Sequence, residues 1–149
     1  MIKLDEVDRL ILKKLQENAR RSFKEIAKEA GVSEATIFVR VKKLQDSGVI
    51  KGFKAIVDHD LVGKKTTAFV LVKANPKEYP KVLEELVDID DICEIHDVTG
   101  EYYAILKIKA ENTDKLAKII DKIGAISGVA GTETILVLKT VKEKLEVNL

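Results

Sequence analysis

Residues 31–50 read "GVSEATIFVRVKKLQDSGVI" and contain the clearest helix signal in the N-terminal part of the chain. Ser33 can cap a helix, and apolar residues follow at helical spacing: Ile37, Val41 and Leu44. Gly48 stands where such a helix would end. We therefore expect a helix from Ser33 to about Ser47, with one apolar face turned toward a core.

Two shorter helices are expected before it. Asp5 can cap the first, with Asp8 at the third helical position. Ser22 can cap the second, with Glu25 in the capping-box position. Gly31 then ends this helix, because glycine adopts the left-handed turn at little cost. Helix, tight glycine turn and helix form the helix-turn-helix arrangement.

The helix over residues 33–47 has an unusual outward face. At about 100° per residue, Ala35, Val39 and Lys42 point away from the apolar stripe, with Phe38, Lys43 and Arg40 beside them. Cations can contact phosphates, and small apolar side chains suit thymine methyl groups in a major groove. The pattern predicts contacts to double-stranded DNA by Ser33, Ala35, Thr36, Phe38, Val39, Arg40, Lys42 and Lys43. The alternative is a solvated helix whose apolar outward residues pack on a neighbouring element or chain.

The segment after this helix changes character twice. Residues 49–58, "VIKGFKAIVD", read as a strand or short hairpin, either a wing beside the helices or a strand that pairs with a second chain. Residues 58–65, "DHDLVGKK", are polar and read as a linker. The sequence thus divides into a winged helix-turn-helix domain at 1–54, a hinge at 55–65 and a second domain at 66–149.

Strands alternate with helices in the second domain. Strands are expected at 66–74, 92–98, 102–110 and 132–140, with helices after Asn75-Pro76 and after Asn112 or Thr113. In the first of these helices Asn75 would be the cap, and the inward stripe would be Tyr79, Val82, Leu83, Leu86 and Val87. Strand–helix–strand occurs twice, which predicts a ferredoxin-like βαββαβ domain with both helices on one face of an antiparallel sheet. The fold class is therefore α+β.

Both faces of this sheet are apolar. In the strands, Phe69, Leu71, Ile95 and Ile105 alternate with the opposite set Ala68, Val70 and Val72. Helices would cover only one face, so we expect a homodimer in which a second copy covers the other.

Composition excludes several classes of protein. Hydrophobic residues make up 46% and charged residues 34% of the 149 residues, and no apolar run reaches membrane-spanning length. We expect a soluble cytoplasmic protein. Cys93 is the only cysteine, and His59 and His96 begin no ligand pattern, so we expect no metal, cofactor or catalytic residue. The net charge of +1 hides an asymmetry: residues 1–54 hold 13 Lys and Arg against 8 Asp and Glu. A basic N-terminal part suits nucleic acid.

These residues carry a family resemblance. The segment "LDEVDRLILKKLQENARRSFKEIAKEAGVSEATIFVRVKKLQDSGVIKGFKAIVD" and the later "VTGEYY" resemble the Lrp/AsnC, or feast/famine, transcription factors over essentially the whole chain. The resemblance implies a winged helix-turn-helix joined by a hinge to a βαββαβ regulatory domain. It also implies homodimers that assemble into tetramers, octamers or larger rings, often with a small amino acid as effector.

The family's effector site suggests a set of residues in this chain. That site lies near a "TG-x-x-D" turn and a threonine-rich strand start, which implies contacts by Thr99, Gly100, Tyr102, Tyr103, Thr132 and Thr134. Tyr103 stands where family members usually carry Asp, and Asp121 is the acid proposed for an effector ammonium. Gly100 also has a plain structural interpretation, as a turn residue.

Three functions compete at this stage. The leading hypothesis is a sequence-specific DNA-binding regulator whose oligomeric C-terminal domain senses an amino acid. A second is a nonspecific architectural protein that coats DNA through the same helices. The third is an enzyme on a ferredoxin-like domain, which the lack of a nucleophile–base pair, carboxylate pair or glycine-rich phosphate loop disfavours.

Overall fold

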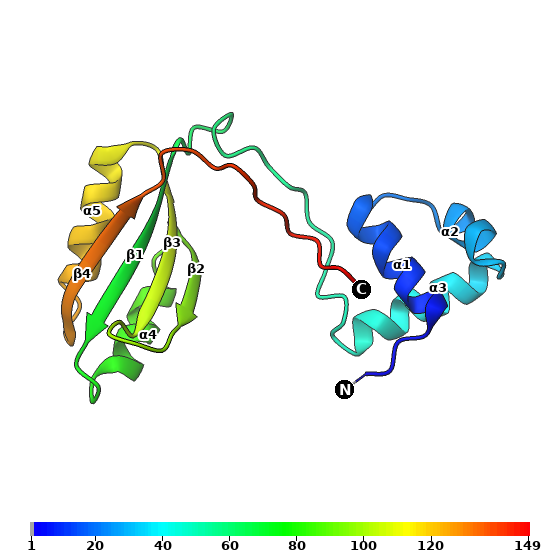
Figure 1. Ribbon diagram of the computed structural model, residues 1–149, viewed down its shortest axis with the longest axis horizontal. Helices are drawn as coiled ribbons and strands as arrows, with labels where there is room; N and C mark the ends of the chain where they lie inside the picture. The colour runs from blue at the N-terminus through cyan, green and yellow to red at the C-terminus, as the bar shows by residue number, and fades with distance from the viewer. Residues whose placement is uncertain (1) are drawn as a thin grey trace. The chain divides into compact units, whose positions relative to one another are not determined.

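The computed structural model describes residues 2–149, which form two compact units (Figure 1). One unit comprises the chain up to Ile56 together with Lys142–Leu149, and the other is Val57–Val141. The first contains α1 (Glu6–Glu17), α2 (Phe23–Ala30) and α3 (Glu34–Asp46). The second contains β1 (Thr66–Ala74), α4 (Tyr79–Val87), β2 (Ile92–Asp97), β3 (Ala104–Ala110), α5 (Thr113–Gly124) and β4 (Val129–Leu136).

Local capping explains where the first helices begin. The Asp8 amide donates to the Asp5 carboxylate at 2.8 Å, and the Asp5 amide donates to Asp8 at 3.2 Å, which completes a capping box. The same reciprocal pair joins Ser22 and Glu25 at the start of α2. Gly31 ends α2 with φ 68°. These predicted boundaries are confirmed.

The three helices share one apolar core. Each helix contributes a fully buried isoleucine, namely Ile11, Ile26 and Ile37. The predicted inward stripe of α3 is buried as well, with Val41 and Leu44 at 3% and 4% exposure. Burying side chains of this size from all three helices is what fixes their packing, since isolated helices this short are marginal in water.

The expected wing is not formed. Residues 49–58 contain no strand, and Ile56 and Val57 are exposed. A strand needs a hydrogen-bonding neighbour, and the described part of the chain supplies none to this segment. The prediction of a strand or hairpin here is therefore wrong for a single protomer.

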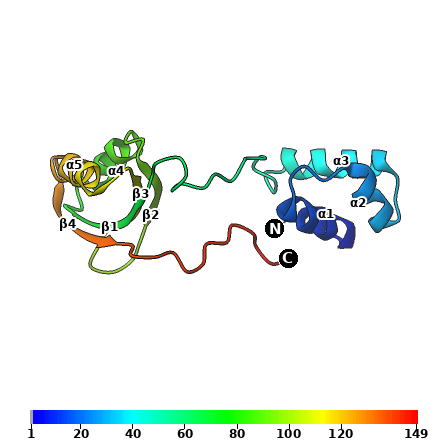
Figure 2. The ribbon, with the colours of Figure 1, turned by 90° about the horizontal axis from the view of Figure 1, so that it is seen from above.

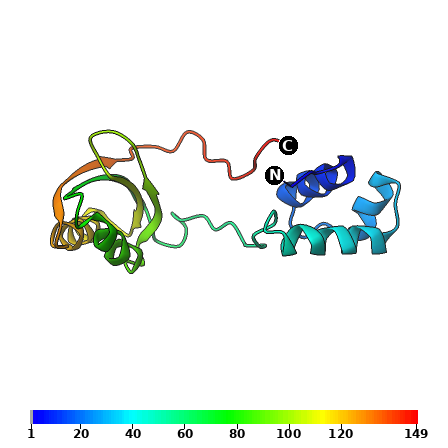
Figure 3. The ribbon, with the colours of Figure 1, turned by 90° about the horizontal axis from the view of Figure 1, so that it is seen from below.

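The second unit is a four-stranded antiparallel sheet in the order β2-β3-β1-β4. Both helices lie on the same side of it, as the two views turned by 90° show (Figure 2, Figure 3). On that side Val70, Leu106 and Ile108 of the strands pack on Val82, Leu86, Ile119 and Ile123 of the helices. The predicted ferredoxin-like arrangement is confirmed.

The start of α4 differs from the prediction. Asn75 does not cap the helix; its carbonyl accepts hydrogen bonds from the amides of Glu78 and Tyr79, which forms a turn before the helix. The helix begins at Tyr79, with Pro80 in its first turn, a position that proline tolerates. Val87 is 70% exposed and does not belong to the inward stripe.

Three strands also differ from the prediction. β2 (Ile92–Asp97) ends one residue before the expected 98, and β3 (Ala104–Ala110) begins two residues after the expected 102. β4 runs over Val129–Leu136, so it begins and ends earlier than the expected 132–140. Ile95 pairs with the buried Leu106 and packs against the helix-covered core, whereas it was expected on the opposite face with Phe69. A register shift between Ile92 and Glu94 changes the alternation of β2, and such a shift leaves no mark in an alternating sequence.

The face of the sheet away from the helices keeps a group of apolar side chains among charged ones. Leu71 lies opposite Ile105 in the register, and Phe69 lies opposite Ile135, which is 47% exposed. This group, Phe69, Leu71, Ile105 and Ile135, is called the open-face patch below. Among residues 2–149 we find no helix with the length and hydropathy needed to span a membrane.

Candidate nucleic-acid interface and effector region

The start of α3 is held by two of the residues predicted to contact DNA. The Ser33 hydroxyl accepts a hydrogen bond from the Thr36 amide at 3.1 Å and lies 2.8 Å from the Thr36 hydroxyl. Both side chains therefore fix the N-terminus of the helix, whose amide groups favour an anion.

The outward face of α3 is apolar at its centre and basic beside it. Phe38 and Val39 are 58% and 63% exposed, and Ala35, Lys42 and Lys43 are exposed too. No ion pair involves Lys42 or Lys43 among residues 2–149. The five side chains form one surface, called the α3 face below, which combines free cations with uncovered apolar groups.

Phe38 has one neighbour that explains part of its position. Its ring lies 6.4 Å from that of Phe23, measured between ring centres, with 59° between the planes. Phe23, Phe38 and Val41 line a shallow hollow between α2 and α3, together with Lys42, Gln45 and Asp46. Phe38 is thus oriented by α2, whereas Val39 is 63% exposed.

Arg40 lies apart from the α3 face. Its guanidinium donates to Asp5 at 2.6 Å and to Asp8 at 2.9 Å, both at the start of α1. The hydrogen bond to Asp5 is the largest of the causes that raise the pKa of Arg40. The pKa of Asp5 is lowered, first by the hydrogen bond from the Asp8 amide and then by Arg40. Sequence reasoning expected a cation facing DNA, and the structure joins that cation to another helix.

Gly100 has the conformation that a turn requires. Its φ is 116°, which side chains rarely adopt, and a Cβ atom there would meet nothing within 4 Å. Backbone conformation, not lack of space, therefore requires glycine. The Val98 amide donates to the Tyr103 carbonyl at 3.0 Å, which closes the turn around Thr99 and Gly100.

Tyr103 packs inside the second unit. Its ring lies 4.8 Å from that of Tyr79 on α4, and the Tyr79 hydroxyl donates to the Tyr103 carbonyl at 2.9 Å. The same hydroxyl reaches Asp97 at 3.2 Å, and burial is the main reason why the pKa of Tyr79 rises to about 12. The tyrosine at this position thus fills space between the sheet and α4.

Tyr102 belongs to a charged group that sequence reasoning missed. Its hydroxyl donates to Glu133 of β4, and the Lys73 ammonium lies 5.0 Å from the centre of its ring. Lys73 also forms an ion pair with Glu101. The hydrogen bond to Glu133 is the largest cause of the raised pKa of Tyr102. Lys73 and Glu133 lie on the open face. The period-two alternation of side chains along β1 and β4 indicates in the sequence that they share this face.

The remaining effector candidates lie on the other face. Thr132 and Thr134 are opposite the buried Val72 and Val70, so they share the face that α4 and α5 cover. Asp121 is exposed on α5. The structure therefore divides the predicted set between two faces of the sheet, with Tyr102 on one and the threonines on the other. Among residues 2–149 no group of three or more His, Cys, Asp or Glu side chains is arranged to hold a metal ion.

Comparisons with known proteins assign both units to the same family of regulators. The sequence model of one protein family, the AsnC-type helix-turn-helix domain, matches residues 4–45. The sequence model of the Lrp/AsnC ligand binding domain matches residues 67–147. The HTH-type transcriptional regulator FL11 of Pyrococcus abyssi is 43% identical over 145 residues, which cover 97% of this chain and 96% of that protein. FL11 of Pyrococcus horikoshii is 42% identical, with the same coverage.

Solved structures extend the likeness to the fold. AsnC of E. coli superposes with a TM-score of 0.92 at 34% identity, covering 96% of this chain and 97% of that one. A transcriptional regulator from Neisseria meningitidis, solved as an L-Met complex, gives a TM-score of 0.91 at 22% identity, covering 98% and 97%. The second likeness concerns the fold alone.

Proposed function

The chain belongs to the Lrp/AsnC family of transcriptional regulators, and from this premise we propose that it is a sequence-specific DNA-binding regulator controlled by a small amino acid. DNA binding is assigned to residues 1–54, residues 55–65 act as the hinge, and residues 66–149 bind the effector and form the oligomer. The observation that supports DNA binding most directly is the α3 face, where Phe38 and Val39 are uncovered beside Lys42 and Lys43, two exposed lysines with no ion pair among residues 2–149.

The residues of this face have different roles. Val39 and Ala35 contact base edges, since apolar groups discriminate thymine by its methyl group. Lys42 and Lys43 contact phosphates, which position the helix but do not read sequence. Ser33 and Thr36 hold the N-terminus of α3 toward a phosphate. Arg40 keeps α3 in place on α1 and reaches DNA only if it leaves Asp5 and Asp8.

The protein functions as a homodimer or a larger assembly. The open-face patch gives two copies an apolar surface to bury together. A dimer presents two copies of α3, so paired half-sites about one helical turn apart, or a multiple of it, are expected. Residues 49–58 are a second element available to a partner, because their backbone lacks a strand neighbour.

Effector binding is assigned to the end of the sheet near the Thr99-Gly100 turn. An amino acid needs an acceptor for its ammonium and donors for its carboxylate. Asp121 is the proposed acceptor, and Thr132, Thr134 and the backbone amides near Gly100 are the proposed donors. The match to the Lrp/AsnC ligand binding domain over residues 67–147 supports a ligand site in this unit, and the Neisseria regulator that shares its fold was solved with L-Met. Tyr103 contributes by packing, and Tyr102 by its bond to Glu133.

The competing function is a nonspecific protein that coats DNA through the same lysines. An enzyme is disfavoured by the names of the relatives, which are transcriptional regulators. We expect selection from random DNA to enrich one paired site, which binds at least about a thousandfold more tightly than random sequence at the same salt concentration. Val39→Ala should then alter the preferred bases. Equal affinity for all sequences would favour the coating protein.

A further inference from the structure

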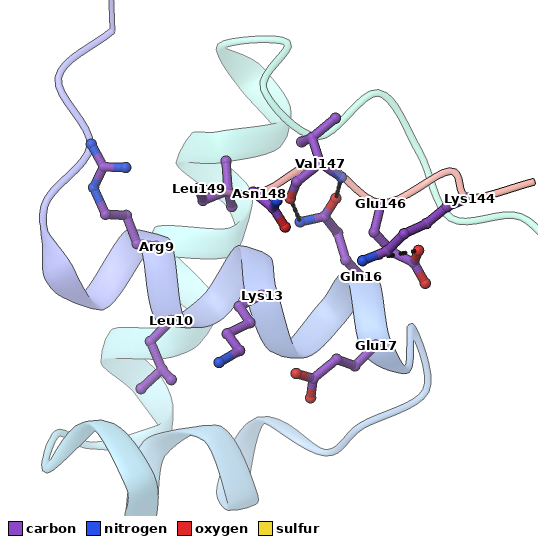
Figure 4. A pocket seen from close by; sticks show the side chains of 10 residues that line it. All are labelled: Arg9, Leu10, Lys13, Gln16, Glu17, Lys144, Glu146, Val147, Asn148 and Leu149. Atoms are coloured by element: carbon purple, nitrogen blue, oxygen red, sulfur yellow. Dashed lines mark hydrogen bonds and ion pairs between the residues drawn. The ribbon is translucent and has the colours of Figure 1, made fainter.

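The last eight residues of the chain pack with the N-terminal unit, although the family's ligand-binding domain extends to residue 147. The contact is specific. The side-chain amide of Gln16, on α1, donates to the Val147 carbonyl at 3.1 Å and accepts from the Val147 amide at 2.8 Å. Figure 4 shows both hydrogen bonds, with the extended chain running past α1.

This pairing has the chemistry of a strand neighbour. A glutamine amide presents one donor and one acceptor side by side, as a backbone peptide group does. Both polar backbone groups of Val147 are satisfied by it, which a side chain with only a donor or only an acceptor could not do. Gln16 thus recognises extended backbone whatever the side chain at 147.

The surroundings favour the same segment. The groove beside Gln16 is lined on α1 by Arg9, Leu10 and Lys13, and on the tail by Glu146, Val147 and Leu149. Glu17 of the helix and Lys144 of the tail line it too, so both sides carry charges of both signs, and Leu10 lies on the same groove as Val147 and Leu149. The apolar surface that the two sides share favours docking.

We propose that this groove on α1 is a docking site for residues 144–149 of the same chain, and that Gln16 holds the backbone of the docked segment. The docked tail is a reversible strap: residues 57–141 are then joined to the N-terminal unit at both of their ends. Val147 and Leu149 remain 64% and 49% exposed, so the contact is small. It forms because the tether keeps the tail at a high effective concentration.

Hydrogen exchange on the full-length chain tests the pairing. The Val147 amide should exchange slowly, and Gln16→Ala should speed its exchange about tenfold, the effect of losing two modest hydrogen bonds. Gln16→Glu should have a smaller effect, because it keeps an acceptor for the amide. Gln45→Ala is the matched control, since Gln45 does not line this groove. Equal exchange in the wild type and Gln16→Ala would overturn the proposal.

Cross-linking tests the assignment to the same chain. Lys13→Cys and Asn148→Cys line the groove without forming these hydrogen bonds, and Cys93→Ser removes the exposed natural thiol. A short bis-maleimide should close a ring within one chain, with severalfold lower yield when Gln16→Ala is added. A product containing two chains would reassign the groove to the tail of a second copy. No product in either form would overturn the docking itself.

Discussion

The guanidinium of Arg40 lies 2.9 Å from the carboxylate of Asp8, although the two residues are 32 positions apart in the chain. Asp5 accepts from the same guanidinium nitrogen. The two acids that cap α1 therefore also hold α3, so one group of three side chains fixes where one helix starts and how another is placed. Its loss should affect folding before it affects DNA contact.

The first prediction concerns this group. Arg40→Ala should lower the midpoint of thermal unfolding of the N-terminal unit by roughly 2–4 °C, because an ion pair at the surface contributes little. Any loss of DNA affinity should then follow the loss of folded protein and leave the salt dependence unchanged. Calorimetry and DNA titration of one preparation give both values. A reduced salt slope with an unchanged unfolding temperature would instead make Arg40 a direct phosphate contact.

The same group gives a pH dependence. The pKa of Asp5 in the folded protein is lowered below 3.8, so its stabilising effect is present above that value and is lost as pH falls through the folded-state pKa. Asp5→Asn keeps a capping side chain but removes the charge. It should be less stable than wild type at pH 7 and equally stable at the acid end of a urea-unfolding series. A difference in stability between the two proteins that stays constant down to the acid end would contradict this pH dependence.

The second prediction concerns phosphate contacts. Lys43→Ala should weaken DNA binding about equally for all sequences and reduce the slope of log affinity against log salt by about one. Lys118→Ala removes an exposed lysine from α5 in the other unit, so the net charge changes by the same amount as in Lys43→Ala. It should leave the salt slope unchanged. Identical slopes for Lys43→Ala and wild type would remove Lys43 from the interface.

Features that depend on residues close together in the chain could be predicted from the sequence. The starts of α1 and α2 follow from residues three positions apart, Asp5 with Asp8 and Ser22 with Glu25, so local reading was sufficient. The topology of the sheet followed from the order of strands and helices. The start of α4 was misplaced because Asn75 and Pro76 favour a turn as well as a helix start.

Features that depend on distant partners were not predictable. The pairing of Arg40 with Asp5 and Asp8 exists only after α1 and α3 have packed. Likewise Glu133 joins Tyr102 because β4 and β3 flank β1, and nothing in either segment alone indicates it. The strand expected at 49–58 has the right composition but lacks a neighbour in this chain. Amphipathic pattern predicts burial, and it does not identify the partner.

The third prediction concerns Gly128, which precedes β4. It has φ 96°, and a Cβ there would lie 2.6 Å from the Cβ of Glu78 and 3.1 Å from Val82. Gly128→Ala should therefore destabilise the second unit by about 1–3 kcal/mol, through strain and through displacement of α4. At Gly131 a Cβ would meet nothing within 4 Å, so Gly131→Ala should be nearly neutral in the same urea titration. Equal effects of the two variants would contradict the steric argument.

The fourth prediction concerns the open-face patch. Leu71→Glu places a charge between Ile105 and Glu133 of the neighbouring strands, so burying this face against a second copy becomes costly. Sedimentation should then give a monomer where wild type gives a dimer or larger species. Val87→Glu adds the same charge at a position on α4 that is already 70% exposed, and it should not change the assembly. A variant Leu71→Glu that still forms dimers would place the interface elsewhere.

The fifth prediction concerns the effector, and it follows from where the structure places the candidate residues. Thr132, Thr134 and α5 share one face, so Asp121 is better placed to act with the threonines than with Tyr102. Calorimetry against the twenty amino acids should give heat for at least one of them. Asp121→Ala and Thr134→Val should each weaken that ligand about tenfold, since each removes a hydrogen-bonding group. Asp114→Ala, at the other end of α5, should bind as wild type does. If none of the twenty amino acids gives heat of binding, the protein does not sense an amino acid. If only Tyr102→Phe abolishes binding of the ligand, the effector site lies on the open face.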